Sequence, residues 1–359
     1  MPKTKDEKIL EELPVNPEQS AELAELQYVS DTDPGITRKK NRRGFIYLNP
    51  KGEYIKDKKI LKRINSLVIP PAWTDVWICS ASKGHIQVTG RDVKKRKQYI
   101  YHPKWDAIRN QTKFFRLIKF AQSLPLIRKR VESDLRKHDL TREKVLAIIT
   151  RLLEETLIRI GNQEYAVNGS YGLTTLKDKH LVVDGGTIQL VFKGKSGKVW
   201  EVDILNKRLA RLVKQCQELP GQELFQYINS GGEYNPVTST DVNNYICEIT
   251  GENFTAKDFR TWGGTLLAAK ELFSLGPAES DKDFKKKTVK AVKNVAKALN
   301  NTTSICRNYY IHPDIIETFY DKTLFVEMKK AEANGMNNRT GFSAHEKAVM
   351  KILKNKLAV

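Results

Sequence analysis

KHLVVDGGTIQLVFKGKSGKVWEVDI, residues 179–204, contains three short apolar runs separated by glycine-containing turns. Within the runs, β-branched and aromatic residues alternate with polar ones, which is typical of strands with one buried face. The two turns, residues 184–186 and 194–197, have the composition of tight hairpin connections. The stretch therefore predicts a small three-stranded antiparallel sheet.

Helical patterns surround this predicted sheet. Residues 141–162 (TREKVLAIITRLLEETLIRIGN) place apolar side chains at helical spacing, and residues 283–300 form an amphipathic pattern with a lysine-rich face. Residues 255–258 (TAKD) and 343–346 (SAHE) resemble capping boxes at the start of two further helices. We expect residues 105–359 to form a mainly α-helical domain that contains the small sheet and includes a C-terminal helix.

Strand patterns return on the N-terminal side of residue 105. The segments DVWICSA (residues 75–81), HIQVTG (85–90) and KQYIYH (97–102) alternate or are rich in β-branched and aromatic residues. They predict a small β-rich domain over residues 38–104. The expected fold class is therefore α+β, with a β-rich N-terminal domain and a larger helical domain.

The charge of the chain is high and uneven. Lysine and arginine exceed aspartate and glutamate by 62 to 42, while residues 1–37 hold nine acids and three lysines. We expect residues 1–37 to be a mobile acidic tail with at most one short helix around residues 20–26. The remaining chain carries the whole positive excess, which favours a polyanionic partner such as nucleic acid. A merely soluble basic surface is the alternative.

Several classes of protein are not indicated. No apolar run approaches the roughly 20 residues that a membrane span requires, and the polar N-terminus lacks a signal-peptide core, so we expect a cytoplasmic protein without a membrane partner. The four cysteines are scattered without a C-x-x-C pair, and Val349 stands where a zincin helix would have its second histidine. Neither a disulfide framework nor a metal site is expected.

A nucleotide site is not expected either. The run KGKSGK suggests a phosphate-binding loop, but the first glycine of the Walker pattern is replaced by Gln189, inside a predicted strand. We therefore expect no ATP binding and no cofactor. Any catalytic chemistry would have to come from tyrosine, lysine and arginine side chains.

Those three residue types suit transfer of a phosphodiester to a tyrosine. Arginines can bind the negative charge on the non-bridging oxygens, nearby cations favour the phenolate, and a lysine can protonate the leaving oxygen. The stretch TTSICRNYYIHPDI (residues 302–315) contains two adjacent tyrosines, Tyr309 and Tyr310. Either one is a nucleophile, or both are core aromatics.

Five segments in order, RIGN, GLTTLKDKH, FKGKSGK, KDFRTWGGT and TTSICRNYYIHP, resemble the type IB DNA topoisomerases of the poxvirus and bacterial branch. The N-terminal segment GRDVKKRKQYIYHPKW adds a sixth, and the resemblance covers about residues 38–320. It implies relaxation of supercoiled DNA through transient single-strand cleavage and a 3′-phosphotyrosyl intermediate, without ATP or metal. It also implies a monomer whose two domains form a clamp around double-stranded DNA.

The resemblance assigns catalytic roles by position. The first catalytic arginine is Arg159, which we expect near the end of the long helix, and the catalytic lysine is Lys195 in the second hairpin turn. The second arginine is Arg260, in the first turns of a capped helix. The nucleophile is the tyrosine before the Ile-x-Pro step, which is Tyr310, and Tyr309 has no catalytic role.

Two further parts of the pattern concern phosphate and DNA binding. Asn301 stands where poxvirus and nuclear enzymes have histidine, and the resemblance implies that it donates to a non-bridging oxygen. The family's groove-contacting strand and its basic approach imply the DNA-binding residues Gln98, Tyr99, Tyr101, Lys94, Lys95, Arg96 and Lys97.

Each assignment has alternatives. Taken singly, Arg159 could complement a helix dipole, Lys195 could be a solvated turn residue and Arg260 could form a surface ion pair. A tyrosine recombinase would use the same groups, but its usual His-x-x-Arg is here Lys257-x-x-Arg260. An architectural DNA-binding protein would explain the charge without explaining the tyrosine and its cations.

Overall fold

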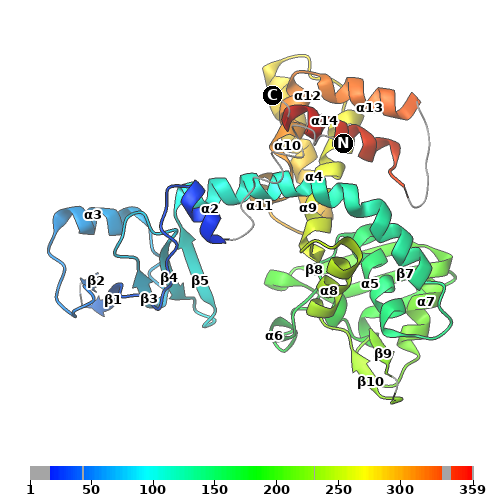
Figure 1. The fold of residues 1–359 in the computed structure, drawn as a ribbon, viewed down its shortest axis with the longest axis horizontal. Helices are drawn as coiled ribbons and strands as arrows, with labels where there is room; N and C mark the ends of the chain where they lie inside the picture. The colour runs from blue at the N-terminus through cyan, green and yellow to red at the C-terminus, as the bar shows by residue number, and fades with distance from the viewer. Residues whose placement is uncertain (1–16, 43, 230, 334–340, 358–359) are drawn as a thin grey trace. The chain divides into compact units, whose positions relative to one another are not determined.

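The structure is a computed structural model that describes residues 17–42, 44–229, 231–333 and 341–357. The chain divides into two compact units, Met1–Phe115 and Arg116–Val359. The division falls inside α4 (Pro103–Asp134), the long helix in Figure 1. Among the described residues, no helix is long and apolar enough to cross a membrane.

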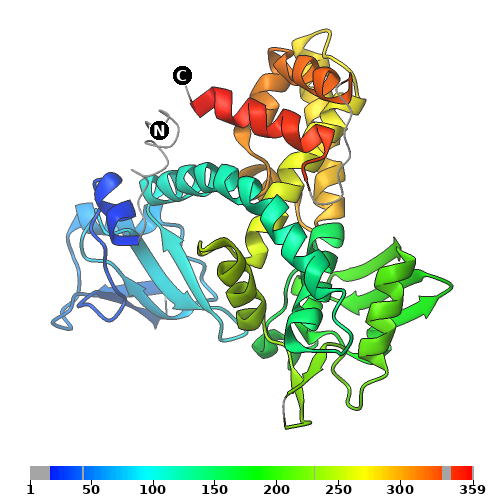
Figure 2. The ribbon, with the colours of Figure 1, turned by 45° about the vertical axis from the view of Figure 1, so that its right-hand side comes forward.

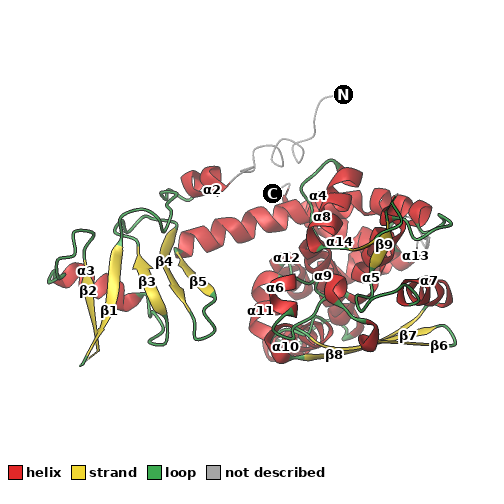
Figure 3. Ribbon diagram, turned by 90° about the horizontal axis from the view of Figure 1, so that it is seen from below, coloured by secondary structure: helices red, strands yellow, loops and turns green. Residues whose placement is uncertain are grey.

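A five-stranded antiparallel sheet forms the N-terminal unit. Its strands are β1 (Ile36–Asn41), β2 (Gly44–Leu48), β3 (Thr74–Ile78), β4 (Ile86–Arg91) and β5 (Lys97–Tyr101). They lie in the order β2-β1-β3-β4-β5, as Figure 3 shows. Helix α3 (Lys58–Ser66), capped by Asp57, contributes Ile64 to a core with Ile36, Val76, Ile78 and Val88. The predicted β-rich domain is thus present.

Residues 17–37 differ from the expected mobile tail. Helix α2 (Pro17–Leu23) packs on Trp105, and the buried residues of this contact are Ala21, Ala24, Leu26 and Trp105. The Tyr28 ring stacks on His85 with 4.3 Å between ring centroids. Counting charges overlooked these apolar side chains, whose burial holds the segment against the sheet domain. Residues 1–16 of the expected tail lie outside the described residues.

Helix α5 (Arg142–Thr156) is the centre of the larger unit. Its residues from Val145 to Ile149 are fully buried, as are Leu152 and Leu153. Five consecutive buried residues span a full turn of a helix, so neighbours surround this part of α5 on all sides. Figure 1 shows the helices of this unit, which are α6 (Gln163–Ala166), α7 (Lys207–Gln217), α8 (Ser239–Thr250), α9 (Ala256–Ser274), α10 (Asp281–Ala298), α11 (Thr303–Tyr309), α12 (Pro313–Tyr320), α13 (Thr323–Ala333) and α14 (Ala344–Leu357).

The predicted three-stranded antiparallel sheet is confirmed. It consists of β6 (Leu181–Asp184), β7 (Thr187–Lys193) and β8 (Val199–Leu205) in that order, and α7 packs against it (Figure 2). The side chains of Ile188, Leu190, Phe192 and Trp200 are buried on one face. A separate two-stranded hairpin contains β9 (Gln226–Ile228) and β10 (Tyr234–Pro236).

Helix α5 ends earlier than its sequence pattern predicts. It stops at Thr156 because Leu157 adopts a left-handed conformation with φ of 55°. Extended backbone follows, in which the Arg159 carbonyl accepts from the Leu173 N–H at 2.9 Å. The predicted extension of the helix toward residue 160 is therefore wrong, and Arg159 lies three residues past the end of α5 instead of within the helix.

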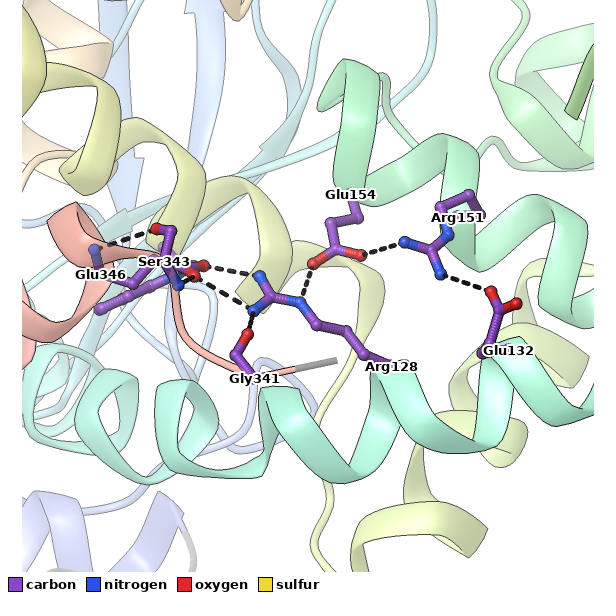
Figure 4. Close-up of polar contacts among 8 residues, drawn as sticks. Arg128, Glu132, Arg151, Glu154, Gly341, Ser343 and Glu346 are labelled. Carbon is purple, nitrogen blue, oxygen red and sulfur yellow. Dashed lines mark hydrogen bonds and ion pairs between the residues drawn. The ribbon is translucent and has the colours of Figure 1, made fainter. Parts of the chain in front are cut away.

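A buried ion network ties α14 to the rest of the larger unit (Figure 4). Arg128 of α4 bonds to Glu154 of α5 and to Glu346 of α14, each at 2.6 Å. Glu346 also accepts the Ser343 N–H at 2.8 Å, and the Ser343 hydroxyl accepts the Glu346 N–H, so the predicted capping box is confirmed. Trp262 of α9 donates to the same carboxylate at 3.4 Å. One carboxylate thus joins α4, α9 and α14.

This network makes stability sensitive to pH. Burial of Glu346 opposes ionisation, but the hydrogen bond and charge of Arg128 outweigh it and lower the pKa of the carboxyl below its ordinary value. Its contribution to the free energy of unfolding is therefore present above the ordinary pKa and is lost as pH falls through the lowered one. We expect Glu346→Gln to reduce the free energy of unfolding by about 1.5–3 kcal/mol near neutral pH.

Urea unfolding across the acid range checks this expectation, because the variant should also show a shallower loss of stability as pH falls. Glu317→Gln is a matched control, since Glu317 pairs with Lys356 at 2.8 Å but is 61% exposed and should change little. Parallel pH profiles for wild type and Glu346→Gln would contradict the expectation.

Candidate active site

Helix α9 begins with a capping box and places Arg260 in the interior. The Thr255 N–H and hydroxyl both donate to Asp258, at 2.8 and 3.1 Å. Arg260 is only 3% exposed and donates to the carbonyls of Leu157 and Leu299, the latter at 2.9 Å. Its guanidinium carbon lies 5.2 Å from the centroid of the Tyr310 ring. The buried cation is thus fixed beside one of the two tyrosines.

The backbone around Tyr310 is fixed by the same helix. Tyr310 directly follows α11 as its C-cap, and the Thr265 hydroxyl donates to the Tyr310 carbonyl at 3.2 Å while accepting the His312 N–H at 3.1 Å. Gly264 allows this close approach, because a Cβ there would lie 2.8 Å from the Tyr310 carbonyl oxygen. Tyr310 is partly buried, whereas its neighbour Tyr309 is exposed.

Electrostatics favour ionisation of Tyr310. Burial opposes the phenolate, but the charge of Arg260, its hydrogen bond to the phenol and the charges of Arg159 and Lys257 outweigh burial. The pKa of Tyr310 therefore lies below its ordinary value. In contrast, burial raises the pKa of the nearby Cys306 thiol to about 11, so this thiol stays neutral at physiological pH.

Arg159 and Asn301 form the second part of the site. The Arg159 guanidinium donates to Asn301 Oδ1 at 2.5 Å, which leaves the amide NH₂ as a donor. Among the described residues, Asn301 Nδ2 and Arg260 Nε are buried donors without a hydrogen-bond partner. Unsatisfied buried donors are costly and uncommon, so such a pair indicates a place for an acceptor. Burial lowers the pKa of both guanidiniums, but arginine remains a cation.

The last expected catalytic residue, Lys195, lies in the turn between β7 and β8. The turn is a short 3₁₀ segment, Lys195–Gly197, in which Ser196 and Gly197 have φ of 64° and 73°. Lys195 is exposed, and the described residues show no hydrogen bond or ion pair between its ammonium group and the other four expected residues. The structure thus brings Arg159, Arg260, Asn301 and Tyr310 together and places Lys195 on a separate projecting turn.

Comparison with known proteins identifies the family of this chain. Residues 95–337 match the family described as the catalytic core of eukaryotic DNA topoisomerase I, and residues 44–92 match the N-terminal domain of bacterial DNA topoisomerase IB. The chain is 34% identical to DNA topoisomerase 1B of Acanthamoeba polyphaga mimivirus over 304 residues, which cover 82% of this chain and 90% of the relative. The chain belongs to the type IB DNA topoisomerases.

More distant relatives extend the match. DNA topoisomerase 1B of Vaccinia virus (strain Copenhagen) is 24% identical over 289 residues, which cover 79% of this chain and 86% of the relative. The resemblance seen in the sequence is therefore confirmed, and the protein is an isomerase whose substrate is DNA.

The residues expected to bind DNA in this topoisomerase lie on and before β5. Tyr99 and Tyr101 share one face of the strand, and their rings stack with centroids 5.7 Å apart. Lys97 on the same face pairs with Asp31 at 2.6 Å. Asp31 belongs to the segment that was expected to be a mobile tail, so its ion pair with Lys97 differs from that expectation.

A second acid lies within the basic approach itself. Asp92 pairs with Arg96 at 2.5 Å and accepts from the Gln98 amide at 3.1 Å. Lys94 and Lys95 are exposed at the turn before β5. Two of the expected DNA-binding side chains are therefore engaged by an internal carboxylate in the free protein.

Sequence reasoning missed Thr265 and Gly264, which follow Arg260 by five and four positions. The available signal was the run of small residues, Gly263 to Thr265, in the middle of a helix, where glycine is unfavourable. Such a run indicates a close approach of another backbone, and here that backbone is the segment of Tyr310.

Removing the Thr265 hydroxyl should disturb both stability and activity. We expect Thr265→Val to lower the free energy of unfolding by about 1–3 kcal/mol, because the buried His312 N–H loses its acceptor. It should also slow DNA relaxation, because a displacement of about 1 Å at a reacting group can cost on the order of 10²-fold in rate. Plasmid relaxation and thermal unfolding measure the two effects.

Thr265→Ser is the matched control, since it keeps the hydroxyl and should retain most of the relaxation rate. Relaxation by Thr265→Val at the wild-type rate would show that this contact does not position Tyr310.

Proposed function

We propose that this topoisomerase relaxes supercoiled DNA by transient single-strand cleavage through a 3′-phosphotyrosyl link to Tyr310, followed by religation, without ATP or metal. The observation that carries the proposal is the buried Arg260 guanidinium beside Tyr310, whose pKa it lowers. A phenolate formed there would be a competent nucleophile toward phosphorus. Tyr309 is exposed, whereas Tyr310 is partly buried beside the Arg260 guanidinium, which supports Tyr310 as the nucleophile.

The transferring phosphate would be bound by the two unsatisfied donors. As Tyr310 Oη bonds to phosphorus and the bond to the 5′-oxygen breaks, negative charge grows on the non-bridging oxygens. Arg260 Nε and Asn301 Nδ2 supply hydrogen bonds to these oxygens, and Arg159 adds a second positive charge. Fixed donors of this kind require little rearrangement during the reaction.

Lys195 would complete the reaction as a general acid. The ammonium group delivers a proton to the departing 5′-oxygen, and the phenolic proton of Tyr310 leaves to solvent. One phosphorus–oxygen ester bond forms as one breaks, so the bond energy is conserved in the phosphotyrosyl ester. The freed 5′-hydroxyl can therefore reverse the reaction after the DNA has rotated, and no nucleotide is consumed.

Double-stranded DNA would be gripped by the N-terminal unit. We place this contact on β5 and its basic approach, with the two units closing around the duplex as a clamp and one chain acting as a monomer. The stacked rings of Tyr99 and Tyr101 and the exposed Lys94 and Lys95 support this part of the proposal. Aromatic and amide groups can contact base edges, while lysines bind phosphates.

The central test replaces each tyrosine in turn. Tyr310→Phe should abolish both relaxation of negatively supercoiled plasmid and the covalent protein–DNA adduct, because it removes the attacking oxygen and little packing. Wild type should relax the plasmid in EDTA without ATP. Agarose-gel relaxation and denaturing gels of the adduct provide the two readouts.

Tyr309→Phe is the matched control and should remain active, with DNA binding retained by both variants. An adduct that persists in Tyr310→Phe and disappears in Tyr309→Phe would overturn the assignment of the nucleophile. Loss of wild-type activity in EDTA would overturn the metal-independent mechanism.

The grip on DNA has a salt-dependent signature. Replacing Lys94, Lys95, Arg96 and Lys97 with glutamine should weaken binding and reduce the slope of log affinity against log salt by roughly one unit per lost phosphate contact. Single-turnover cleavage at saturating DNA should change little, because these residues lie in the other unit from Tyr310.

Variants with fewer substitutions separate the contributions of these four residues to the slope of log affinity against log salt. Lys94 and Lys95 should account for more of the slope than Arg96 and Lys97, because the latter two are paired with Asp92 and Asp31. An unchanged slope in the fourfold variant would rule out this grip.

A further inference from the structure

Three consecutive residues, 299–301, each contact a different element of the candidate active site. The Leu299 carbonyl accepts from Arg260 at 2.9 Å, and the Asn301 side chain accepts from Arg159 at 2.5 Å. Between them, the Asn300 side-chain amide donates to the Val199 carbonyl at 2.9 Å. The first two contacts involve expected catalytic arginines, whereas the third reaches the hairpin that carries Lys195.

Val199 is the first residue of β8, directly after the turn that contains Lys195. The other strand of this hairpin is held elsewhere, because the Lys193 carbonyl accepts from the Tyr171 N–H at 2.8 Å and the Gly194 carbonyl from the Ser170 hydroxyl at 3.3 Å. The Asn300 amide therefore holds the β8 side of the hairpin, opposite the Tyr171 contact. The turn itself contains two residues with positive φ and projects into solvent.

The conformation of Asn300 suits this role. Its φ of 47° is left-handed, where asparagine and glycine are tolerated better than other residues. Its N–H bonds to the Lys297 carbonyl at 3.1 Å just past the end of α10, so the backbone completes the helix end while the side chain reaches β8. Glycine would satisfy the backbone but could not make the side-chain contact.

We propose that Asn300 is a positioning residue that holds the Lys195 hairpin against the loop of Asn301 and thereby sets the approach of Lys195 to the leaving oxygen. The proposal rests on the role of Lys195 as the general acid in the proposed function. Asn300 itself contacts the hairpin backbone and takes no part in proton transfer. Its effect on the reaction should therefore be expressed only through Lys195.

The test uses the full chain and two DNA substrates, one with the ordinary 5′-bridging oxygen and one with sulfur at that position. A thiolate leaves without needing a proton, so the sulfur substrate bypasses general-acid catalysis. Single-turnover cleavage at saturating DNA is measured for wild type, Lys195→Ala, Asn300→Gly, Asn300→Asp and the double variant Lys195→Ala/Asn300→Gly. Thermal unfolding verifies that each variant folds.

On the oxygen substrate, Asn300→Gly should cleave about tenfold more slowly, a smaller loss than the roughly 10²–10⁴-fold expected when the general acid is removed in Lys195→Ala. On the sulfur substrate, both should approach the wild-type rate. The double variant should be no slower than Lys195→Ala, because residues acting through one step are not additive. Asn300→Asp keeps the size but loses the amide donor and should follow Asn300→Gly.

Asn294→Ala is the matched control, on helix α10, which ends just before Asn300. It removes an exposed amide that bonds Glu271 at 2.6 Å, away from the hairpin, and should cleave both substrates at the wild-type rate.

The possible results distinguish failure of the positioning role of Asn300 from failure of the proposed function. If Lys195→Ala is rescued by sulfur while Asn300→Gly cleaves the oxygen substrate at the wild-type rate, the positioning role is wrong and the general acid stands. Slow cleavage of both substrates by Asn300→Gly, or additive losses in the double variant, would also refute a role through Lys195. If sulfur fails to rescue Lys195→Ala, the assignment of the general acid falls, and this inference with it.

Discussion

The burial of the Arg260 guanidinium is the constraint from which the arrangement of the site follows. A cation removed from water must have its charge and its N–H groups matched within the protein. The backbone carbonyls of Leu157 and Leu299 accept hydrogen bonds from the Arg260 guanidinium. Both residues lie just past the end of a helix. The end of α5 and the end of α10 therefore meet at one side chain of α9. The segments that carry Arg159 and Asn301 follow directly from those two ends, which explains why their side chains are in contact.

The matching of donors to acceptors is incomplete, and the proposed binding of a phosphate would use the donors that are left over. Arg260 Nε and Asn301 Nδ2 stay buried without acceptors among the described residues, a cost of about 1–3 kcal/mol for each group. Donors that are already desolvated and fixed interact strongly with a charge that develops in a transition state. Such a site lowers the stability of the free protein, and the fully buried residues of α5 together with the Arg128–Glu346 contact offset this loss. Among the described residues, the larger unit thus contains one ion network whose charged groups are paired and one site that retains buried donors without acceptors.

Local sequence patterns correctly predicted the elements that depend on contacts between residues close in the sequence. The β6–β8 sheet follows from alternation and glycine turns, and the capping boxes before α9 and α14 follow from their end residues. The end of α5 was mispredicted because the left-handed Leu157 is stabilised by Arg260, more than 100 positions later. The packing of α2 on Trp105 was missed because charge counts say nothing about which face of a segment is apolar. The expected catalytic residues could be proposed only through the resemblance of ordered motifs. The small residues from Gly263 to Thr265 indicate a close backbone approach but not its partner, and the contact of Asn300 depends on tertiary proximity that no local pattern contains.

The positively charged side chains discussed above fall into three groups that differ in solvent exposure and pairing. Surface lysines such as Lys94 and Lys95 act through a screened field, so their attraction for a polyanion weakens as salt rises. Arg260 is almost fully buried and Arg159 is partly buried, so their effect on Tyr310 is less screened by salt. A third group, Lys97 and Arg96, is already neutralised by Asp31 and Asp92 and must exchange a carboxylate for a phosphate before it can contribute. The formal net charge of +20 therefore overstates the attraction for DNA that we propose at β5, and it does not determine the pKa of Tyr310, because the two depend on different cations in different units.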